Sequence, residues 1–251
     1  MNKVEEFAAL HVPGKPLLLV NIWDAGSAKV VAAAGARAIA TGSYGVAEAQ
    51  GLKDGEDFPL DAVLSNLERI LAVTDLPVTI DLESGYGADP AAVGRSVGMA
   101  FEAGAAGINM EDRLPGRNEL LPVAEQAARL SAAAGTGIFV NARCDVFRGQ
   151  DVATARDALV AAVLERARAY ADAGARSLFV PFMADRAAIS AICEGSPLPV
   201  NILRSKSGPT HRELAELGVA RISHGHQPWA AAMAYLATQA RKVFAGEEPD
   251  Y

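Results

Sequence analysis

The sequence predicts an α/β protein, and within that class a (β/α)₈ TIM-type barrel. Three observations indicate this fold. Short apolar runs alternate eight times with helical stretches along the 251 residues. The helices end in a repeated small-residue pattern that leads directly into the next apolar run. The chain length suits one barrel, and no linker, low-complexity tract or domain break divides it, so we expect residues 1–251 to form a single domain.

The first units begin after a short amphipathic segment. We expect a strand over residues 16–23, which are too few and too uniformly apolar for a surface helix. A helix over residues 28–34 follows, with turn and N-cap residues supplied by Asp24 and Ser27. The second unit has a strand at 38–42, a polar loop through 51–57 and a helix at 59–73. The third strand is the apolar start of 77–87, and its helix starts at Asp89 and Pro90. The later strands are expected at residues 107–111, 138–143, 177–181, 199–203 and 220–223, with helices at 122–134 and 154–173 among them.

Four of the helix ends share one pattern, at residues 34–38, 103–107, 173–177 and 217–221. In each, a glycine ends the helix and a small residue leads into the following strand. This is the short connection that parallel α/β proteins use between a helix and the next strand. The pattern leaves an open doubly wound sheet as the alternative architecture.

The composition narrows the range of functions. Hydrophobic residues make up 51% and charged residues 21% of the chain, which predicts a large buried core. The net charge of -7 argues against a broad nucleic-acid surface, for which a basic stripe is expected. No apolar run is long enough to span a bilayer, and no signal peptide opens the chain, so we expect a cytoplasmic protein without membrane contact. Two cysteines, Cys144 and Cys193, form no zinc or disulfide pattern.

The most informative stretch is the end of the third predicted strand. Asp81 and Glu83 follow the β-branched run 78–80 at positions i and i+2, which share one face of a strand. Two like charges held close together need a cation, and carboxylate oxygens suit a hard divalent ion such as Mg²⁺. A solvated acidic strand end is the alternative interpretation.

In a barrel the active site lies where the strands end, so polar residues at those positions form the candidate site. The set is Ser43, Tyr44, Asp54, Asp81, Glu83, Glu111, Asp112, Arg143, Asp145, Asn201, Arg204, His224 and His226. Four or more carboxylates beside an arginine favour a metal together with an anionic ligand.

Four motifs occur in order: Thr41-Gly-Ser-Tyr-Gly45 with Gly51-Leu-Lys-Asp54, Ile80-Asp-Leu-Glu-Ser-Gly-Tyr-Gly87, Gly107-Ile-Asn-Met-Glu-Asp112 and Asn141-Ala-Arg-Cys-Asp145. In order and spacing, over residues 16–235, they resemble the isocitrate lyase and phosphoenolpyruvate mutase superfamily. The resemblance implies a Mg²⁺-dependent barrel, with Mn²⁺ as an alternative metal, that acts on small 2-oxo or 2-hydroxy carboxylates. It also implies a homotetramer or homodimer in which subunits exchange the last helix.

The resemblance further implies roles for individual residues. Asp81 is the expected direct metal ligand, and Glu83, Glu111 and Asp54 are expected to hold metal-bound waters. Backbone amides around Gly42, Ser43 and Tyr44 would bind the substrate carboxylate, and Arg143 would pair with its oxygens. The catalytic residues are therefore expected to be Arg143, Asp54 and Tyr44, and Asn201 is a further substrate-binding candidate.

Two departures from the superfamily affect the expected reaction. Its isocitrate and methylisocitrate lyases carry a cysteine loop after the fourth strand, whereas residues 112–122 contain neither Cys nor His. Position 83 is Glu where Asp is usual. We hypothesise a trimmed gating loop and a simpler lyase that cleaves a C–C bond or decarboxylates through an enolate-like intermediate, like oxaloacetate decarboxylase or methylisocitrate lyase. The alternatives are P–C chemistry, like phosphoenolpyruvate mutase or phosphonopyruvate hydrolase, and a non-catalytic carboxylate-binding barrel.

Three other groups are candidates for a nucleophile, a metal site or a phosphate-binding site. Cys144 lies beside Arg143 but should point to the opposite face of its strand, which argues against a nucleophile. His224 and His226 have the spacing of a metal pair without a third ligand nearby in sequence. The 204–208 segment resembles the place where many barrels bind phosphate. A solvated loop is the favoured interpretation, and a phosphate-binding barrel aldolase is the competing enzyme hypothesis.

Overall fold

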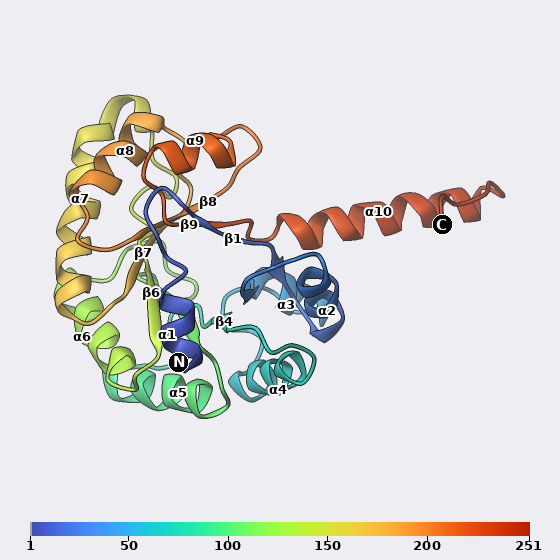
Figure 1. Cartoon of the computed structure of the whole chain (residues 1–251), viewed down its shortest axis with the longest axis horizontal. Coiled ribbons are helices and arrows are strands. Elements are labelled where there is room, and N and C mark those ends of the chain that lie inside the picture. Colours follow the sequence, from blue (N-terminus) through green and yellow to red (C-terminus); the bar gives the residue numbers. More distant parts are fainter. Residues whose placement is uncertain (1) are drawn as a thin grey trace.

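The computed structural model describes residues 2–251 and shows parallel strands arranged as a barrel (Figure 1). In chain order the strands are β1 (Leu17–Leu19), β2 (Asn21–Ile22), β3 (Ile39–Thr41), β4 (Val78–Asp81), β5 (Gly107–Glu111), β6 (Phe139–Arg143), β7 (Ser177–Val180), β8 (Val200–Leu203) and β9 (Arg221–Ser223). Their order in the sheet is β1-β9-β8-β7-β6-β5-β4-β3-β2. Because β1 and β2 are consecutive parts of one extended segment, the two edges of the sheet meet there. The predicted (β/α)₈ barrel is confirmed, and the open doubly wound alternative is wrong.

Helices alternate with the strands around the outside of this barrel (Figure 1). They are α1 (Lys3–Ala8), α2 (Ala25–Ala33), α3 (Ser43–Ala49), α4 (Leu60–Leu71), α5 (Pro90–Glu102), α6 (Val123–Ala134), α7 (Val152–Asp172), α8 (Arg186–Gly195), α9 (His211–Glu216) and α10 (Gln227–Phe244). Most lie within three residues of their predicted limits. Helix α3 was not predicted. It contains Gly45, which suits the close approach of α3 to α10, since a Cβ there would lie 3.2 Å from Cβ of Trp229.

The predicted first strand is divided in two. Leu17–Leu19 pair with β9, whereas Asn21–Ile22 pair with β3, and Val20 lies between them. Buried and exposed side chains still alternate along this divided segment. Leu17 and Leu19 are buried, whereas Leu18 and Val20 are exposed. One extended segment therefore closes the barrel by bonding to different neighbours along its length.

Local sequence explains where the helices begin and end. Asp24, Asp89 and Asp185 are N-caps, and each side chain accepts a hydrogen bond from the backbone three residues later at 2.7–2.8 Å. The four glycines of the repeated helix-end pattern adopt left-handed conformations, with φ of +97°, +106°, +94° and +86° at Gly35, Gly104, Gly174 and Gly218. A residue with a Cβ is strained in that conformation, so glycine ends these helices.

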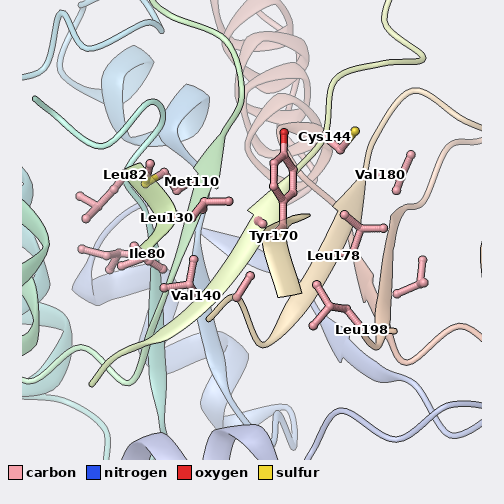
Figure 2. Close-up of a cluster of buried hydrophobic side chains, with 14 of the residues drawn as sticks. Ile80, Leu82, Met110, Leu130, Val140, Cys144, Tyr170, Leu178, Val180 and Leu198 are labelled. Atoms are coloured by element: carbon pink, nitrogen blue, oxygen red, sulfur yellow. The ribbon is translucent and has the colours of Figure 1, made fainter. Parts of the chain in front are cut away.

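The main core lies between the strands and the surrounding helices. Side chains from the strands, such as Ile80, Val140 and Leu178, pack with Leu130 of α6 and Tyr170 of α7 (Figure 2). A second cluster lies at the amino ends of the strands, where Phe7 of α1 packs with Leu17, Leu19 and Phe139. The amino end of the barrel is therefore filled by apolar side chains, and only the carboxyl end is left open for a ligand.

Helix α10 extends away from the barrel instead of packing along it (Figure 1). Gln239 is the one residue buried along its length, and Tyr235, Leu236 and Phe244 are exposed. At the base of α10 an apolar groove of about 330 Å³ is lined by Val20, Val30 and other residues of the β2–α2 region. Across residues 2–251, no helix has both the length and the apolar character that crossing a membrane requires.

A buried polar network joins α7 to the ends of β5 and β6. Asp112 is fully buried and accepts hydrogen bonds from the Tyr170 hydroxyl at 2.8 Å, from Arg166 at 3.2 Å and from the backbone N–H of Asp145 at 2.9 Å. The sequence placed Asp112 among the rim carboxylates. In the structure, the Asp112 side chain instead points into the protein interior, where its charge is compensated by Arg166.

We expect Asp112→Ala to lower the free energy of unfolding by about 3 kcal/mol or more, because it leaves the buried Arg166 unpaired. Tyr170→Phe removes one hydrogen bond and should cost about 1 kcal/mol. Urea unfolding measures both. Asp157→Ala is the control, since Asp157 is an exposed residue of α7 without a side-chain partner within residues 2–251. Equal stability of Asp112→Ala and the control would contradict the network's role.

Candidate active site

A cavity of about 450 Å³ opens at the carboxyl ends of the strands. Its walls come from strand ends and the loops that follow them all around the barrel, the usual location of a TIM-barrel site. The sequence-derived candidates that line it are Gly42, Ser43, Tyr44, Asp54, Asp81, Glu83, Glu111, Arg143 and His226. The fold thus brings together residues from position 42 to position 226 of the chain.

Asp81 and Glu83 both face the cavity, but strand alternation is not the reason. Strand β4 ends at Asp81, and Glu83 has a left-handed backbone with φ of +47°. Gly85 and Tyr86 are also left-handed, at +105° and +49°. The chain therefore turns sharply after β4, and the turn returns the Glu83 carboxylate to the Asp81 side. The backbone N–H of Glu83 donates to Asp81 Oδ1 at 3.2 Å.

The surroundings of the cavity carboxylates disfavour their ionised forms, which raises their pKa values. Burial raises the pKa of Glu83 to about 8, and the nearby charge of Asp81 adds to the shift. Burial also raises the pKa of Glu111 to about 7, although Arg143 acts in the opposite direction. The pKa of Asp81 is raised as well, by burial first and by Asp54 further, against the effect of Arg143. A bound cation would lower the free-energy cost of keeping these carboxylates ionised.

Arg143 is held in one orientation by two carboxylates. Its Nη1 lies 2.6 Å from Glu111 Oε2, and its Nε and Nη2 donate to the two oxygens of Asp145 at 2.7 and 3.0 Å. Burial alone would lower the pKa of Arg143, but Glu111 and Asp145 outweigh it and raise the pKa. The guanidinium is therefore a permanent and well-positioned cation at the cavity wall.

The segment 42–44 forms the wall opposite Arg143's strand. Gly42 is the N-cap of α3 and has no side chain to cap it, so the first N–H groups of the helix lack a side-chain partner from the cap. The N–H of Ser43 lies 3.5 Å from Asp81 Oδ2. The Tyr44 ring packs edge-on against His226 at 5.5 Å and Trp229 at 5.7 Å. Backbone donors and a phenol hydroxyl are thus available at this wall.

The loop after β5 covers part of the cavity. Arg113 and Leu120 form an antiparallel bridge at its base, and the backbone N–H of Leu121 donates to the Asp112 carbonyl at 2.9 Å. Between them, residues 114–118 line the cavity. The segment is short, yet it is a folded part of the wall.

Not every candidate reaches the cavity. Asn201 is fully buried inside the barrel, where its amide bonds to Asn141 at 3.0 Å, to the Arg221 carbonyl at 3.1 Å and to Ser223 at 3.2 Å. Its expected contact with substrate does not fit this position, because it lies one layer below the strand ends and its donors are occupied.

Cys144 and the pair His224 and His226 do not form the sites that their positions in the sequence suggested. Cys144 is fully buried in the main core, and burial raises the pKa of its thiol well above the ordinary value, which disfavours the thiolate. His224 pairs with His211, Nε2 to Nε2 at 3.1 Å, and not with His226. The residue that sequence reasoning missed is Phe182, which lines the cavity with a left-handed backbone and lies over Arg143 and Arg148 at 5.7 and 5.5 Å. No sequence motif marks it.

The donors fit a hard divalent cation bound largely through water. Among residues 2–251, no three His, Cys, Asp or Glu side chains converge closely enough to ligate a metal directly. Asp54, Asp81, Glu83 and Glu111 nevertheless line one cavity, so carboxylate oxygens are the donors that they offer to a cation there. Mg²⁺ keeps several waters and takes one or two carboxylates in this way.

Comparisons with known proteins find relatives that match most of the chain. The sequence model of the family described as phosphoenolpyruvate phosphomutase matches residues 7–244. The crystal structure of a protein provisionally assigned as a phosphonomutase, from Burkholderia cenocepacia, is 50% identical with a TM-score of 0.92, covering 96% of this chain and 98% of that one. An uncharacterized protein from Mycobacterium tuberculosis is 36% identical over 244 residues, 96% of this chain and 90% of its own. The 2-methylisocitrate lyase of Escherichia coli is 32% identical over 213 residues, 76% of this chain and 70% of the enzyme.

The raised pKa values predict how stability depends on pH when divalent metal is removed with EDTA. Glu83 and Glu111 titrate near 4.5 when unfolded but at about 8 and about 7 when folded, so between these values the folded chain binds more protons. Stability should therefore fall as pH rises through this window. His11, whose pKa is lowered to about 3 by burial, acts in the opposite direction only below about pH 6.5.

Urea unfolding between about pH 7 and about pH 8.5, in EDTA and in Mg²⁺, measures this dependence. The decline should be smaller in Mg²⁺, which favours ionised carboxylates. Glu83→Gln should reduce the decline in EDTA. Constant or rising stability in EDTA over this range would contradict the assigned shifts.

Proposed function

This chain belongs to the phosphoenolpyruvate phosphomutase family, whose model spans residues 7–244, and from that membership we propose its reaction. The family contains lyases and mutases, and the chain is an enzyme of that kind. The proposed reaction makes or breaks a C–C bond beside the carbonyl of a small 2-oxo or 2-hydroxy carboxylate, with Mg²⁺ or Mn²⁺ as cofactor. The observation that carries the proposal is the convergence of Asp54, Asp81, Glu83 and Glu111 on one cavity beside Arg143.

The proposed metal site is centred on Asp81, with Glu83, Glu111 and Asp54 holding water. These four side chains supply oxygen donors, which suit Mg²⁺. When bound, the ion supplies positive charge that stabilises an oxyanion developing on the substrate carbonyl.

The chain's own groups bind and orient the substrate. The backbone N–H groups of Ser43 and Tyr44 bind its carboxylate beside Gly42, whose own N–H donates to the Ile22 carbonyl at 3.2 Å. The Tyr44 hydroxyl provides a further hydrogen bond. Arg143 stabilises the negative charge of the enolate-like intermediate. Since Glu111 and Asp145 already hold the guanidinium in place, little reorganisation is needed as that charge develops. Asp54, which lines the cavity, is the remaining proposed catalytic group.

Within C–C chemistry, decarboxylation is favoured over cleavage by the superfamily's isocitrate lyase pattern. The loop over the cavity has no cysteine or histidine between residues 112 and 122, which the lyase acid/base pattern of the superfamily requires. A decarboxylation leaves the same enolate without needing that residue. The curated relatives include proteins named 2-methylisocitrate lyase, phosphoenolpyruvate phosphomutase and oxaloacetate decarboxylase. P–C chemistry is the second candidate, because Arg117 and Asn118 line the cavity and could bind a phosphonate.

The proposed assembly is a homotetramer or homodimer with the last helix exchanged. Helix α10 leaves the barrel with Tyr235 and Leu236 exposed, and the apolar groove at its base is lined by Val20, Val30 and Pro228 among others. An α10 from a second copy would cover apolar surface on both subunits, which supports exchange.

We expect metal-dependent release of pyruvate, or of another small 2-oxo acid, from one of oxaloacetate, phosphonopyruvate, isocitrate and methylisocitrate. Asp81→Ala should abolish it, because the direct ligand is lost. Arg143→Ala should lower kcat/KM by about 100-fold or more. Arg143→Lys, the control, keeps the charge but loses the two-pronged geometry and should also be impaired. No turnover, with a substrate still raising Tm in Mg²⁺, would favour a non-catalytic carboxylate-binding barrel.

For the assembly, we expect Leu236→Asp to yield monomers in size-exclusion chromatography with light scattering. Leu236 is 57% exposed on α10, and a charge there opposes burial against a partner. The matched control is Met99→Asp, since Met99 is 48% exposed but lies on α5. An unchanged oligomer in Leu236→Asp would contradict the exchange of α10.

A further inference from the structure

The loop that carries Asp54 to the cavity has little packing of its own. Residues 51–58, the 51–58 loop, join α3 to α4, and most of them are exposed. Gly51 and Gly55 are left-handed, with φ of +73° and +112°, and a Cβ at either position would meet no atom within 4 Å. The position of Asp54 must therefore depend on contacts elsewhere in the loop.

The 83–87 turn, which carries Glu83, faces this loop and presents a ring of donors. Around the left-handed residues Glu83, Gly85 and Tyr86, the N–H groups of Ser84 and Tyr86 point to one side, whereas the Gly85 N–H between them donates to the Leu82 carbonyl at 2.6 Å. Such a backbone arrangement, called a nest, binds an anion. Here the anion is the side chain of Glu56: its Oε1 accepts from the Ser84 N–H at 3.1 Å, the Tyr86 N–H at 3.2 Å and the Ser84 hydroxyl at 2.6 Å.

The contact is reciprocal. The backbone N–H of Glu56 donates to Glu83 Oε2 at 2.8 Å. Glu56 itself is left-handed, with φ of +64°, a conformation that side-chain-bearing residues adopt only when other contacts favour it. One residue thus binds the turn with its side chain and orients the Glu83 carboxylate with its backbone.

The turn is fixed independently from its other side. Arg129 of α6 is buried and donates to the carbonyls of Ser84 and Gly87, both at 2.9 Å. The Tyr86 hydroxyl makes a further hydrogen bond to the end of the 51–58 loop, where it donates to the Phe58 carbonyl at 2.8 Å. The turn is therefore the stable element, and the loop is attached to it through Glu56 near the middle and Phe58 at the end.

We propose that Glu56 is a positioning residue: its carboxylate, seated on the amides of Ser84 and Tyr86, holds the 51–58 loop so that Asp54 and Glu83 face the metal site together. This rests on the proposed function of the cavity. Glu56 does not line the cavity, so it acts through Asp54 and Glu83 and not by touching substrate.

The test measures the loop and the metal site separately. Lys53 is exposed in the 51–58 loop and offers a trypsin site whose cleavage rate reports loop opening. Glu56→Ala should speed cleavage after Lys53 by about fivefold or more. It should also weaken Mn²⁺ binding, followed by electron paramagnetic resonance, by about tenfold, as loss of a group that orients metal ligands does. Glu56→Gln keeps an acceptor oxygen without the charge and should fall between Glu56→Ala and the unsubstituted protein.

Two variants are controls. Asp57→Asn changes the neighbouring carboxylate, which has no side-chain partner within residues 2–251, and should leave both readouts within about twofold. Tyr170→Phe lowers overall stability far from the loop and should not speed cleavage at Lys53. Unchanged cleavage in Glu56→Ala, or faster cleavage with unchanged Mn²⁺ affinity, would overturn the proposal. Absence of Mn²⁺ binding by the unsubstituted protein would instead overturn the proposed function.

Discussion

The arrangement of the cavity depends on the buried pairing of Arg143 with Glu111 and Asp145. The Asp145 side chain is buried and also forms ion pairs with Arg113 and Arg148. It therefore holds several cationic side chains in place at the end of β6. Removing ions from water is costly, and close pairing with hydrogen bonds is what offsets it. Because Arg143 is held from both sides, it presents a fixed positive charge to the cavity, and Asp54, Asp81 and Glu83 line the same cavity without pairing with it.

A second layer of polar groups lies beneath the cavity. Arg221 is fully buried inside the barrel, where Nη2 donates to Asn109 and no carboxylate is bonded to it. Burial lowers the pKa of Arg221 to about 9, and the charge of Asp81 acts against that shift. The acidic rim is thus partly balanced by a cation below it. Asn141 and Asn201 complete this layer by hydrogen bonding across the barrel, which explains why the interior tolerates polar side chains.

The two loops over the cavity are secured by different means. The segment after β5 is pinned at its base by backbone bonds around Asp112, whose carboxylate is in turn buried against α7. The 51–58 loop has backbone bonds to α3 at its start, from Gly51 and Leu52, and beyond them it is held by contacts with the 83–87 turn. Glu83 belongs both to this attachment and to the proposed metal site, since its carboxylate accepts from the Glu56 N–H.

The sequence by itself determined the alternation of strands and helices, the glycine helix ends and the position of the candidate carboxylates at strand ends. These follow from local patterns of hydrophobicity and turn chemistry, which act over a few residues. Tertiary structure decided the division of the first strand at Val20, because barrel closure sets which neighbour each residue bonds. It also decided side-chain direction beyond each strand end: Glu83 reaches the cavity through a left-handed turn, Asp112 points inward and Asn201 lies one layer too deep. Periodicity stops where a strand stops, so those directions come from long-range packing.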